Sequence, residues 1–134
     1  MASPAKDAPA VKTTHVWRTA RSFGYAFEGL ATILRTQPNF WVHLLAGCAA
    51  LVLGAVLHLS PAEMALLVLT IGLVLIVESI NTALEAMCDL ASPGYHPLVK
   101  RAKDISAAAV LIAAIAALGN ALLLFGPRLA SLVR

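Results

Sequence analysis

Four polar side chains follow one another at helical spacing in the middle of the sequence: Glu78, Asn81, Glu85 and Asp89. At about 100° per residue, these positions fall on one stripe of a helix. A carboxylate can accept the proton of a hydroxyl group, and carboxylate oxygens are ligands that Mg²⁺ prefers in proteins. The stripe therefore predicts a general base at Glu78 and a magnesium ligand at Glu85.

The apolar run before this stripe makes its position unusual. Met64 to Val77 carries no charged residue, so the helix that ends in the stripe is suited to lipid. If the helix begins near Pro61 and rises about 1.5 Å per residue, Glu78 lies roughly 25 Å along it, near the inner edge of the hydrocarbon. An ionisable side chain at that depth is costly, which favours a function for Glu78. Asp89 is more simply a solvated acid that faces the basic residues of the next connection.

The composition indicates a membrane protein. Of 134 residues, 60% are hydrophobic and 13% are charged, and the mean hydropathy is +0.83. A water-soluble domain of this length needs a more polar surface than so few charged side chains supply. Nucleic-acid binding is not expected, because the net charge of only +3 is accounted for by membrane orientation. Cys48 and Cys88 have no metal-ligand spacing and are interpreted as packing residues.

The hydropathy pattern predicts an all-α integral membrane fold with an N-terminal interfacial amphipathic helix and three transmembrane helices. The interfacial helix is expected at about residues 17–36, where apolar residues recur at helical spacing. The spans are expected at about 40–59, 61–90 and 98–125, the last ending at Gly126-Pro127. Residues 1–14 are expected to form a flexible tail, and 15–134 a single membrane domain.

The distribution of Lys and Arg predicts which helix ends face the cytoplasm, because positive residues are retained there. The turn between the first two spans has none, and Arg128 and Arg134 are the only ones left outside. The others precede the first span or lie between the second and third: Lys6, Lys12, Arg18, Arg21, Arg35, Lys100, Arg101 and Lys103. The N-terminus and the end of the acid stripe are therefore expected on the cytoplasmic side, where nucleotides are.

The segment ESINTALEAMCDLASPGYHPLVKRAKDISAAAVL, residues 78–111, closely resembles the bacterial small integral-membrane lipid kinases, the diacylglycerol kinase and undecaprenol kinase family. The similarity extends back through FGYAFEGL (residues 23–30) and NFWVH (residues 39–43). The resemblance implies a multi-pass homotrimer in the bacterial inner membrane. It also implies that MgATP phosphorylates a lipid alcohol at the cytoplasmic face.

The resemblance also implies roles for single residues. Glu78 is expected as the catalytic base, and Asn81 is expected to position the reacting groups. Glu85 is expected to hold the metal and ATP. Contacts to ATP are further expected from Arg18, Tyr25, Lys103 and Asp104. An ammonium group suits phosphate and a carboxylate can bind adenine or ribose, although membrane anchors and a polar first turn would explain these four residues as well.

The chain departs from the diacylglycerol kinase pattern at two positions. Gln37 stands where that pattern has a metal-binding glutamate, and its amide oxygen is a weaker Mg²⁺ ligand, which leaves the number of metal ions open. His43 stands where that branch has another glutamate, so the substrate expectation shifts to undecaprenol. A lone histidine near a helix start can also do no more than hydrogen-bond within the bundle, and His96 can simply precede Pro97 at a helix start.

The leading hypothesis is an ATP-dependent lipid kinase that acts on undecaprenol, with diacylglycerol as the alternative substrate. A small oligomeric transporter or proton-conducting protein is the alternative from another class. A conduction path needs polar residues across the membrane, yet Met64 to Val77 offers only Thr70 as a hydrogen-bonding side chain. Gly24 and Gly29 lack the spacing and context of a phosphate loop, so the expected kinase does not use one.

Overall fold

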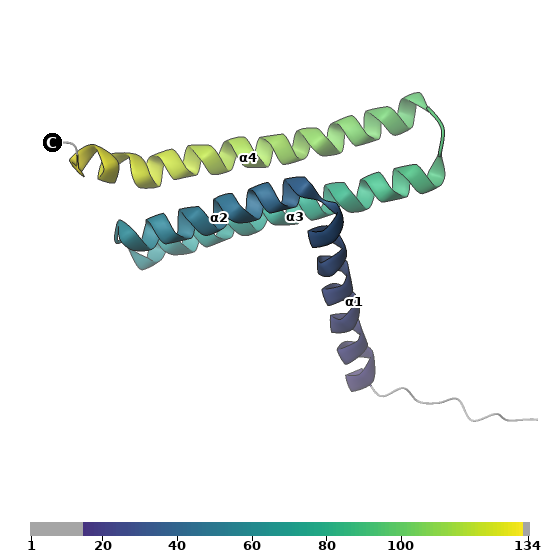
Figure 1. Cartoon of the computed structure of the whole chain (residues 1–134), viewed down its shortest axis with the longest axis horizontal. Coiled ribbons are helices and arrows are strands. Elements are labelled where there is room, and N and C mark those ends of the chain that lie inside the picture. The colour runs from purple at the N-terminus through teal and green to yellow at the C-terminus, as the bar shows by residue number, and fades with distance from the viewer. Residues whose placement is uncertain (1–14, 133–134) are drawn as a thin grey trace, which may run out of the picture. The chain divides into compact units, whose positions relative to one another are not determined.

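The computed structural model describes residues 15–132, with side chains described from residue 21 onward. This part of the chain is all-α, as predicted, with four helices in the order α1 (His15–Thr36), α2 (Pro38–Val56), α3 (Pro61–Ala91) and α4 (Pro97–Leu132) (Figure 1). The tail predicted for residues 1–14 lies outside the described residues.

Helix α1 presents large apolar side chains to its surroundings. Phe23, Tyr25 and Phe27 are all more than 60% exposed. The contacts divide the chain into two units, Met1–Thr32 and Ile33–Arg134, so most of α1 belongs to the first. The predicted helix is confirmed, whereas its place in the membrane interface and the single domain stay predictions.

Three helices, α2, α3 and α4, are long and apolar enough to cross a membrane, which confirms the predicted number of spans by length and composition. Helix α2 begins two residues before the start of the predicted span, at Pro38, and ends three residues before the predicted end, at Val56. At 36 residues, α4 is about 54 Å long and exceeds the roughly 30 Å of hydrocarbon.

Helix α3 begins with a complete capping box. The Ser60 hydroxyl accepts a hydrogen bond from Glu63 N–H, and the Glu63 carboxylate accepts one from Ser60 N–H at 2.8 Å. Pro61 occupies the first turn, where its missing N–H costs nothing. These residues satisfy backbone donors at the helix start and fix where the apolar run begins.

The prediction that the last helix ends at Gly126-Pro127 was wrong, because α4 continues through Pro127 to Leu132. Pro127 cannot donate a backbone hydrogen bond one turn back, which normally destabilises a helix. Here the hydrogen bonds of Arg128 stabilise the part of α4 around Pro127. Its guanidinium donates to the Leu124 carbonyl at 2.9 Å and to both oxygens of Glu63 on α3.

Helix α3 packs against both α2 and α4, and α4 runs antiparallel beside it (Figure 1). Side-chain pairs mark this register at three levels: Glu63 with Arg128, Thr70 with Asn120, and Asp89 with Lys103. On the other side, a Cβ at Gly47 of α2 would lie 2.7 Å from the Ile71 side chain, so α2 approaches α3 closely there. These contacts fix which residues of α2 and α4 lie level with the acid stripe.

Candidate active site at one end of α3 and α4

The acid stripe of α3 continues the buried face of that helix. The buried residues of α3 are Leu67, Val74, Glu78 and Asn81, which share one face. Glu78 is only 2% exposed, and no side chain among the described residues forms a hydrogen bond or ion pair with its carboxyl group. A carboxyl group held in this way is costly and needs an explanation other than folding.

The residues of the neighbouring helices that lie level with Glu78 are apolar. Counting from the contact of Gly47 with Ile71, the antiparallel register places Phe40 of α2 level with Glu78. Counting from the Glu63–Arg128 pair places Ala113 of α4 at the same level. Both are buried apolar residues, so neither offers the carboxyl group a polar partner at this level.

The next two members of the stripe are joined to each other. Asn81 Nδ2 donates to Glu85 Oε1 at 3.1 Å, as an amide and a carboxylate one turn apart can do. Asn81 Oδ1 is buried and has no hydrogen-bond partner. An unsatisfied buried acceptor costs roughly 1–3 kcal/mol, so this oxygen is available to a donor or cation that enters the site.

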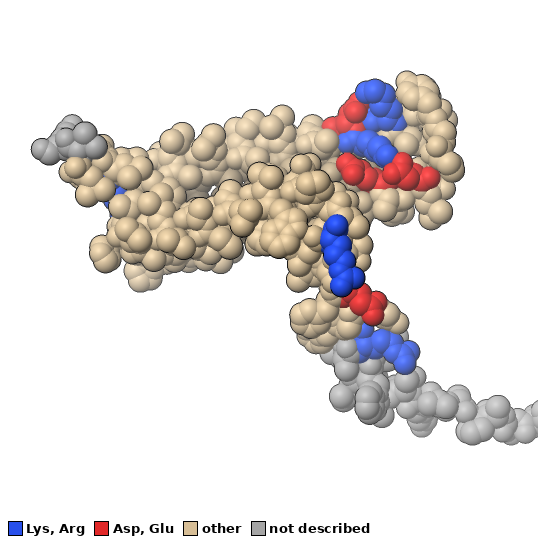
Figure 2. Space-filling view, in the orientation of Figure 1, with Lys and Arg blue, Asp and Glu red and all other residues tan. Residues whose placement is uncertain are grey.

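Charged groups gather at the hairpin end of α3 and α4, and this view shows no charged side chain along the middle of these helices (Figure 2). Lys103 Nζ lies 2.5 Å from Asp89 Oδ1 and also interacts electrostatically with Glu85. Asp104 pairs with Lys100 one turn earlier, at 2.5 Å. The expectation that Asp89 faces the basic connection is therefore confirmed.

A polar pocket of about 240 Å³ lies at this end of the α3–α4 hairpin. Lys103 and Asp104, both expected to contact ATP, line it together with Asp89 and Tyr95. His96 also lines the pocket, and its Nδ1 accepts a hydrogen bond from Leu98 N–H at 3.2 Å. That bond confirms the interpretation of His96 as a residue of the helix start. The pocket offers both ammonium groups and acceptors, as a nucleotide phosphate and its base require.

The oxygens near the stripe suit Mg²⁺, although they do not complete its coordination. Glu85 offers a carboxylate and Asn81 an unpaired amide oxygen, and Mg²⁺ typically takes one or two carboxylates plus water and substrate phosphate. Among the described residues, no group of three or more His, Cys, Asp or Glu could hold a metal ion. Gln37 is the N-cap residue of α2 and is half-buried, and its side chain makes no capping hydrogen bond. Its role as a weak ligand stays a prediction.

Two expected site residues belong to the other unit of the chain. Arg18 lies in α1, but its side chain is outside the described residues. Tyr25 is 64% exposed on α1. Their contacts to a nucleotide therefore stay predictions. His43, by contrast, lies in α2 and is half-buried along one wall of a separate apolar cavity.

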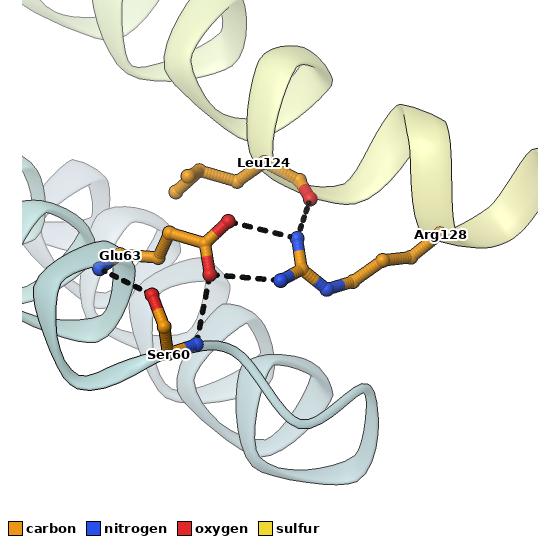
Figure 3. Close-up of polar contacts among 4 residues, drawn as sticks. All are labelled: Ser60, Glu63, Leu124 and Arg128. Atoms are coloured by element: carbon orange, nitrogen blue, oxygen red, sulfur yellow. Dashed lines mark hydrogen bonds and ion pairs between the residues drawn. The ribbon is translucent and has the colours of Figure 1, made fainter.

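Two polar contacts were missed from the sequence. Asn120 Nδ2 donates to Thr70 Oγ1 at 2.8 Å, within the apolar part of α3 and α4. At the opposite end of α3 from the acid stripe, Arg128 forms a two-pronged ion pair with Glu63 (Figure 3). The capping signature of Ser60 and Glu63 was a signal for the helix start, but it could not reveal the arginine.

Comparisons with known proteins identify the family of the chain. Residues 24–125 match the family described as prokaryotic diacylglycerol kinase. A Synechocystis protein named diacylglycerol kinase is 47% identical over 115 residues, which cover 84% of this chain but only 65% of that relative. The undecaprenol kinase of Bacillus subtilis is 39% identical over 112 residues, covering 84% of this chain and 91% of the relative. The diacylglycerol kinase of Escherichia coli is 37% identical over 105 residues, covering 78% and 86%.

The matched range includes the acid stripe and both lysines of the polar pocket, as well as the long helices. Together they indicate a membrane lipid kinase, for which ATP is the phosphate donor. The chain belongs to the prokaryotic diacylglycerol kinase family. This membership sets aside the alternative of a transporter or proton-conducting protein.

Proposed function

We propose that this chain transfers the terminal phosphoryl group of ATP to the hydroxyl group of a membrane lipid at the cytoplasmic face. The hydroxyl oxygen bonds to the γ-phosphorus, and the bond from that phosphorus to the bridging oxygen of ADP breaks. The hydroxyl proton goes to the Glu78 carboxylate. The observation that carries this proposal is a buried carboxyl group, 2% exposed, on a helix long enough to cross the membrane.

The neighbouring residues position the reacting groups. The unpaired Oδ1 of Asn81 can accept a hydrogen bond from the lipid hydroxyl or from water at the phosphate. Lys103 lies beside Glu85 and Asp89 and can pair with a nucleotide phosphate. Mg²⁺ held by Glu85 would neutralise charge on the phosphates. Most of the rate gain is then positioning and electrostatics, as in other phosphoryl transfers.

Undecaprenol is the proposed acceptor. The segments NFWVH and YHPLVKRAKD resemble the undecaprenol kinase branch, and the Bacillus subtilis relative carries that name. Diacylglycerol is the second candidate, because the Synechocystis relative at 47% identity is named diacylglycerol kinase. Both acceptors present a hydroxyl group at the membrane surface, so the site chemistry is the same for either.

The proposed setting is a homotrimer in the bacterial inner membrane, with the N-terminus in the cytoplasm. The family resemblance supports the trimer. The positions of Lys and Arg support the orientation, since the α3–α4 hairpin carries Lys100, Arg101 and Lys103. In this setting Arg18 and Tyr25 are further candidates for contact with ATP.

The test is lipid-dependent consumption of ATP by the purified full-length protein in detergent micelles. Undecaprenol and diacylglycerol are supplied in parallel, and both ADP release and radiolabelled phosphate in the lipid are measured. We expect labelled undecaprenyl phosphate. Labelling of diacylglycerol alone would replace the proposed acceptor with the second candidate. An absence of lipid-dependent ADP release with both acceptors would overturn the proposed function.

A further inference from the structure

A cavity of about 230 Å³ lies between α2, α3 and α4, on the same face of α3 as the acid stripe. Leu67, Thr70, Ile71 and Val74 form its α3 side. Val74 precedes Glu78 by one helical turn, or about 6 Å. The cavity therefore begins directly below the proposed catalytic base and runs toward the middle of the membrane.

The hydrophobic cluster of the bundle lies at the far end of the cavity. Leu67 packs there with Leu124 and Phe125, and all three side chains are buried. The distance from Leu67 to Glu78 along α3 is about 16 Å, roughly half the hydrocarbon thickness. The cavity thus extends from near the site to the hydrophobic cluster.

The only hydroxyl group in the α3 wall of the cavity is already satisfied. Thr70 Oγ1 donates to the Leu66 carbonyl at 2.7 Å and accepts from Asn120 Nδ2 at 2.8 Å. A satisfied hydroxyl adds little polarity, so this wall suits a hydrocarbon occupant better than water.

Small residues form most of the other two walls: Ala46, Gly47, Ala50, Ala114, Ala117 and Ala121. In lipid, small residues usually allow neighbouring helices to close on each other. Here α2 and α4 each pack mainly on α3 and have little contact with one another among the described residues. The small side chains therefore leave a cavity between the helices, because α2 and α4 do not close on each other.

We infer that this cavity binds the segment of the acceptor lipid's hydrocarbon chain nearest to its hydroxyl group. The inference rests on the proposed lipid kinase function and adds the element that positions the acceptor. An apolar cavity of about 150 Å³ holds one benzene, whereas pockets for whole ligands occupy about 300–1,000 Å³. A cavity of about 230 Å³ therefore fits a chain segment, with the rest of the chain in the bilayer. Binding this segment below Glu78 would hold the hydroxyl group at the carboxylate.

Ala117→Leu tests the inference by filling the cavity from α4. Ala116→Leu is the matched control, because Ala116 is an exposed neighbour on the same helix and does not line the cavity. In micelles with undecaprenol or diacylglycerol, whichever the wild type phosphorylates, A117L should raise KM for the lipid by about tenfold or more. KM for ATP should stay within about twofold, and A116L should match the wild type in both. An assembled A117L protein with an unchanged lipid KM would contradict the inference, whereas a wild type without lipid-dependent turnover would contradict the kinase proposal instead.

Photolabelling of the wild type provides a second measurement that needs no variant. An acceptor lipid with a diazirine a few carbons from its hydroxyl group is irradiated in micelles with the protein, and the labelled peptides are sequenced. We expect labels within residues 67–74 and 114–121, on the cavity side. Labels confined to outward-facing residues such as Leu69 and Ile76 would contradict the inference. Equal cavity labelling by a diazirine phosphatidylcholine, which has no free acceptor hydroxyl, would also contradict it.

Discussion

Glu78 is the least exposed carboxyl group that the structure describes, and it follows about four turns of apolar helix. Its position decides what the site can do. A lipid hydroxyl group lies near the edge of the hydrocarbon, whereas the phosphate donor ATP is soluble. A base at the edge of the hydrocarbon can therefore reach the lipid hydroxyl group and lie next to ATP. The Oδ1 atom of Asn81, one turn further along, is a buried acceptor without a partner.

The variant Glu78→Gln should lose about 10²- to 10⁴-fold in kcat, because an amide of nearly the same shape cannot accept the hydroxyl proton. Lipid-dependent ADP release measures the loss, and size-exclusion chromatography checks that the protein still assembles. Glu28→Gln is the control, since Glu28 is an exposed carboxylate of α1 with no assigned role. Turnover of E78Q close to that of the wild type would remove Glu78 as the base.

Lys103→Gln should raise KM for ATP by about tenfold or more while leaving KM for the lipid near the wild-type value. The ammonium group lies in the polar pocket beside Asp89 and Glu85, where it can pair with a phosphate. Arg101→Gln is the control, because Arg101 is an exposed cation of the same connection that does not line the pocket. Steady-state kinetics at varied ATP and varied lipid separate the two constants, and equal effects of both variants would argue for general membrane anchoring.

An ion pair joins α3 and α4 at the end away from the site. Glu63 closes the capping box of α3 and accepts two hydrogen bonds from Arg128 (Figure 3). One carboxylate therefore caps the start of α3 and also binds the part of α4 that follows Pro127. Both side chains are about 30% exposed, so the ion pair is worth less than a buried one. Bidentate geometry still makes it one of the stronger surface pairs.

Two substitutions at Glu63 separate its two contacts. Glu63→Gln keeps a side chain that can serve the capping box but removes the charge, so it should lower the free energy of unfolding only slightly. Glu63→Ala removes both contacts and should lower the free energy of unfolding clearly further. Unfolding in mixed detergent micelles measures both values. Kinase turnover should be preserved in E63Q, because Glu63 and Glu78 lie about 22 Å apart along α3. Equal destabilisation by the two variants would show that the cap contributes nothing.

The pattern of the sequence was enough to predict the helices and the face of α3 that carries the acids. Apolar length and Pro61 located α3 to within one residue of its end at Ala91, and the 100° periodicity placed Glu78, Asn81 and Glu85 together. The continuation of α4 past Pro127 was not predictable, because it accompanies a contact between Arg128 and a residue 65 positions earlier. Local rules treat proline as a stop and cannot include such a partner.

The surroundings of the site depended on the register of the packed helices, which periodicity does not give. Phe40 and Ala113 lie level with Glu78 only because Gly47 meets Ile71 and Arg128 meets Glu63. The sequence of each helix shows which of its faces is apolar, but it does not show the axial register between that helix and its neighbour. The cavity below Glu78 was hidden for the same reason, since small residues on α2 and α4 usually indicate close packing.

The orientation of the bundle decides whether the site can meet ATP at all. The α3–α4 hairpin carries Lys100, Arg101 and Lys103, whereas at the other end Arg128 is paired with Glu63. Positive charge therefore favours a cytoplasmic hairpin. In a background without native cysteines, Gly94→Cys at the hairpin should react with a membrane-impermeant maleimide only after the cells are permeabilised. Ala62→Cys, at an exposed position at the start of α3, should react with the same maleimide in intact spheroplasts. The reverse pattern would place the Glu78 carboxyl group on the side without nucleotides and would be incompatible with the proposed kinase.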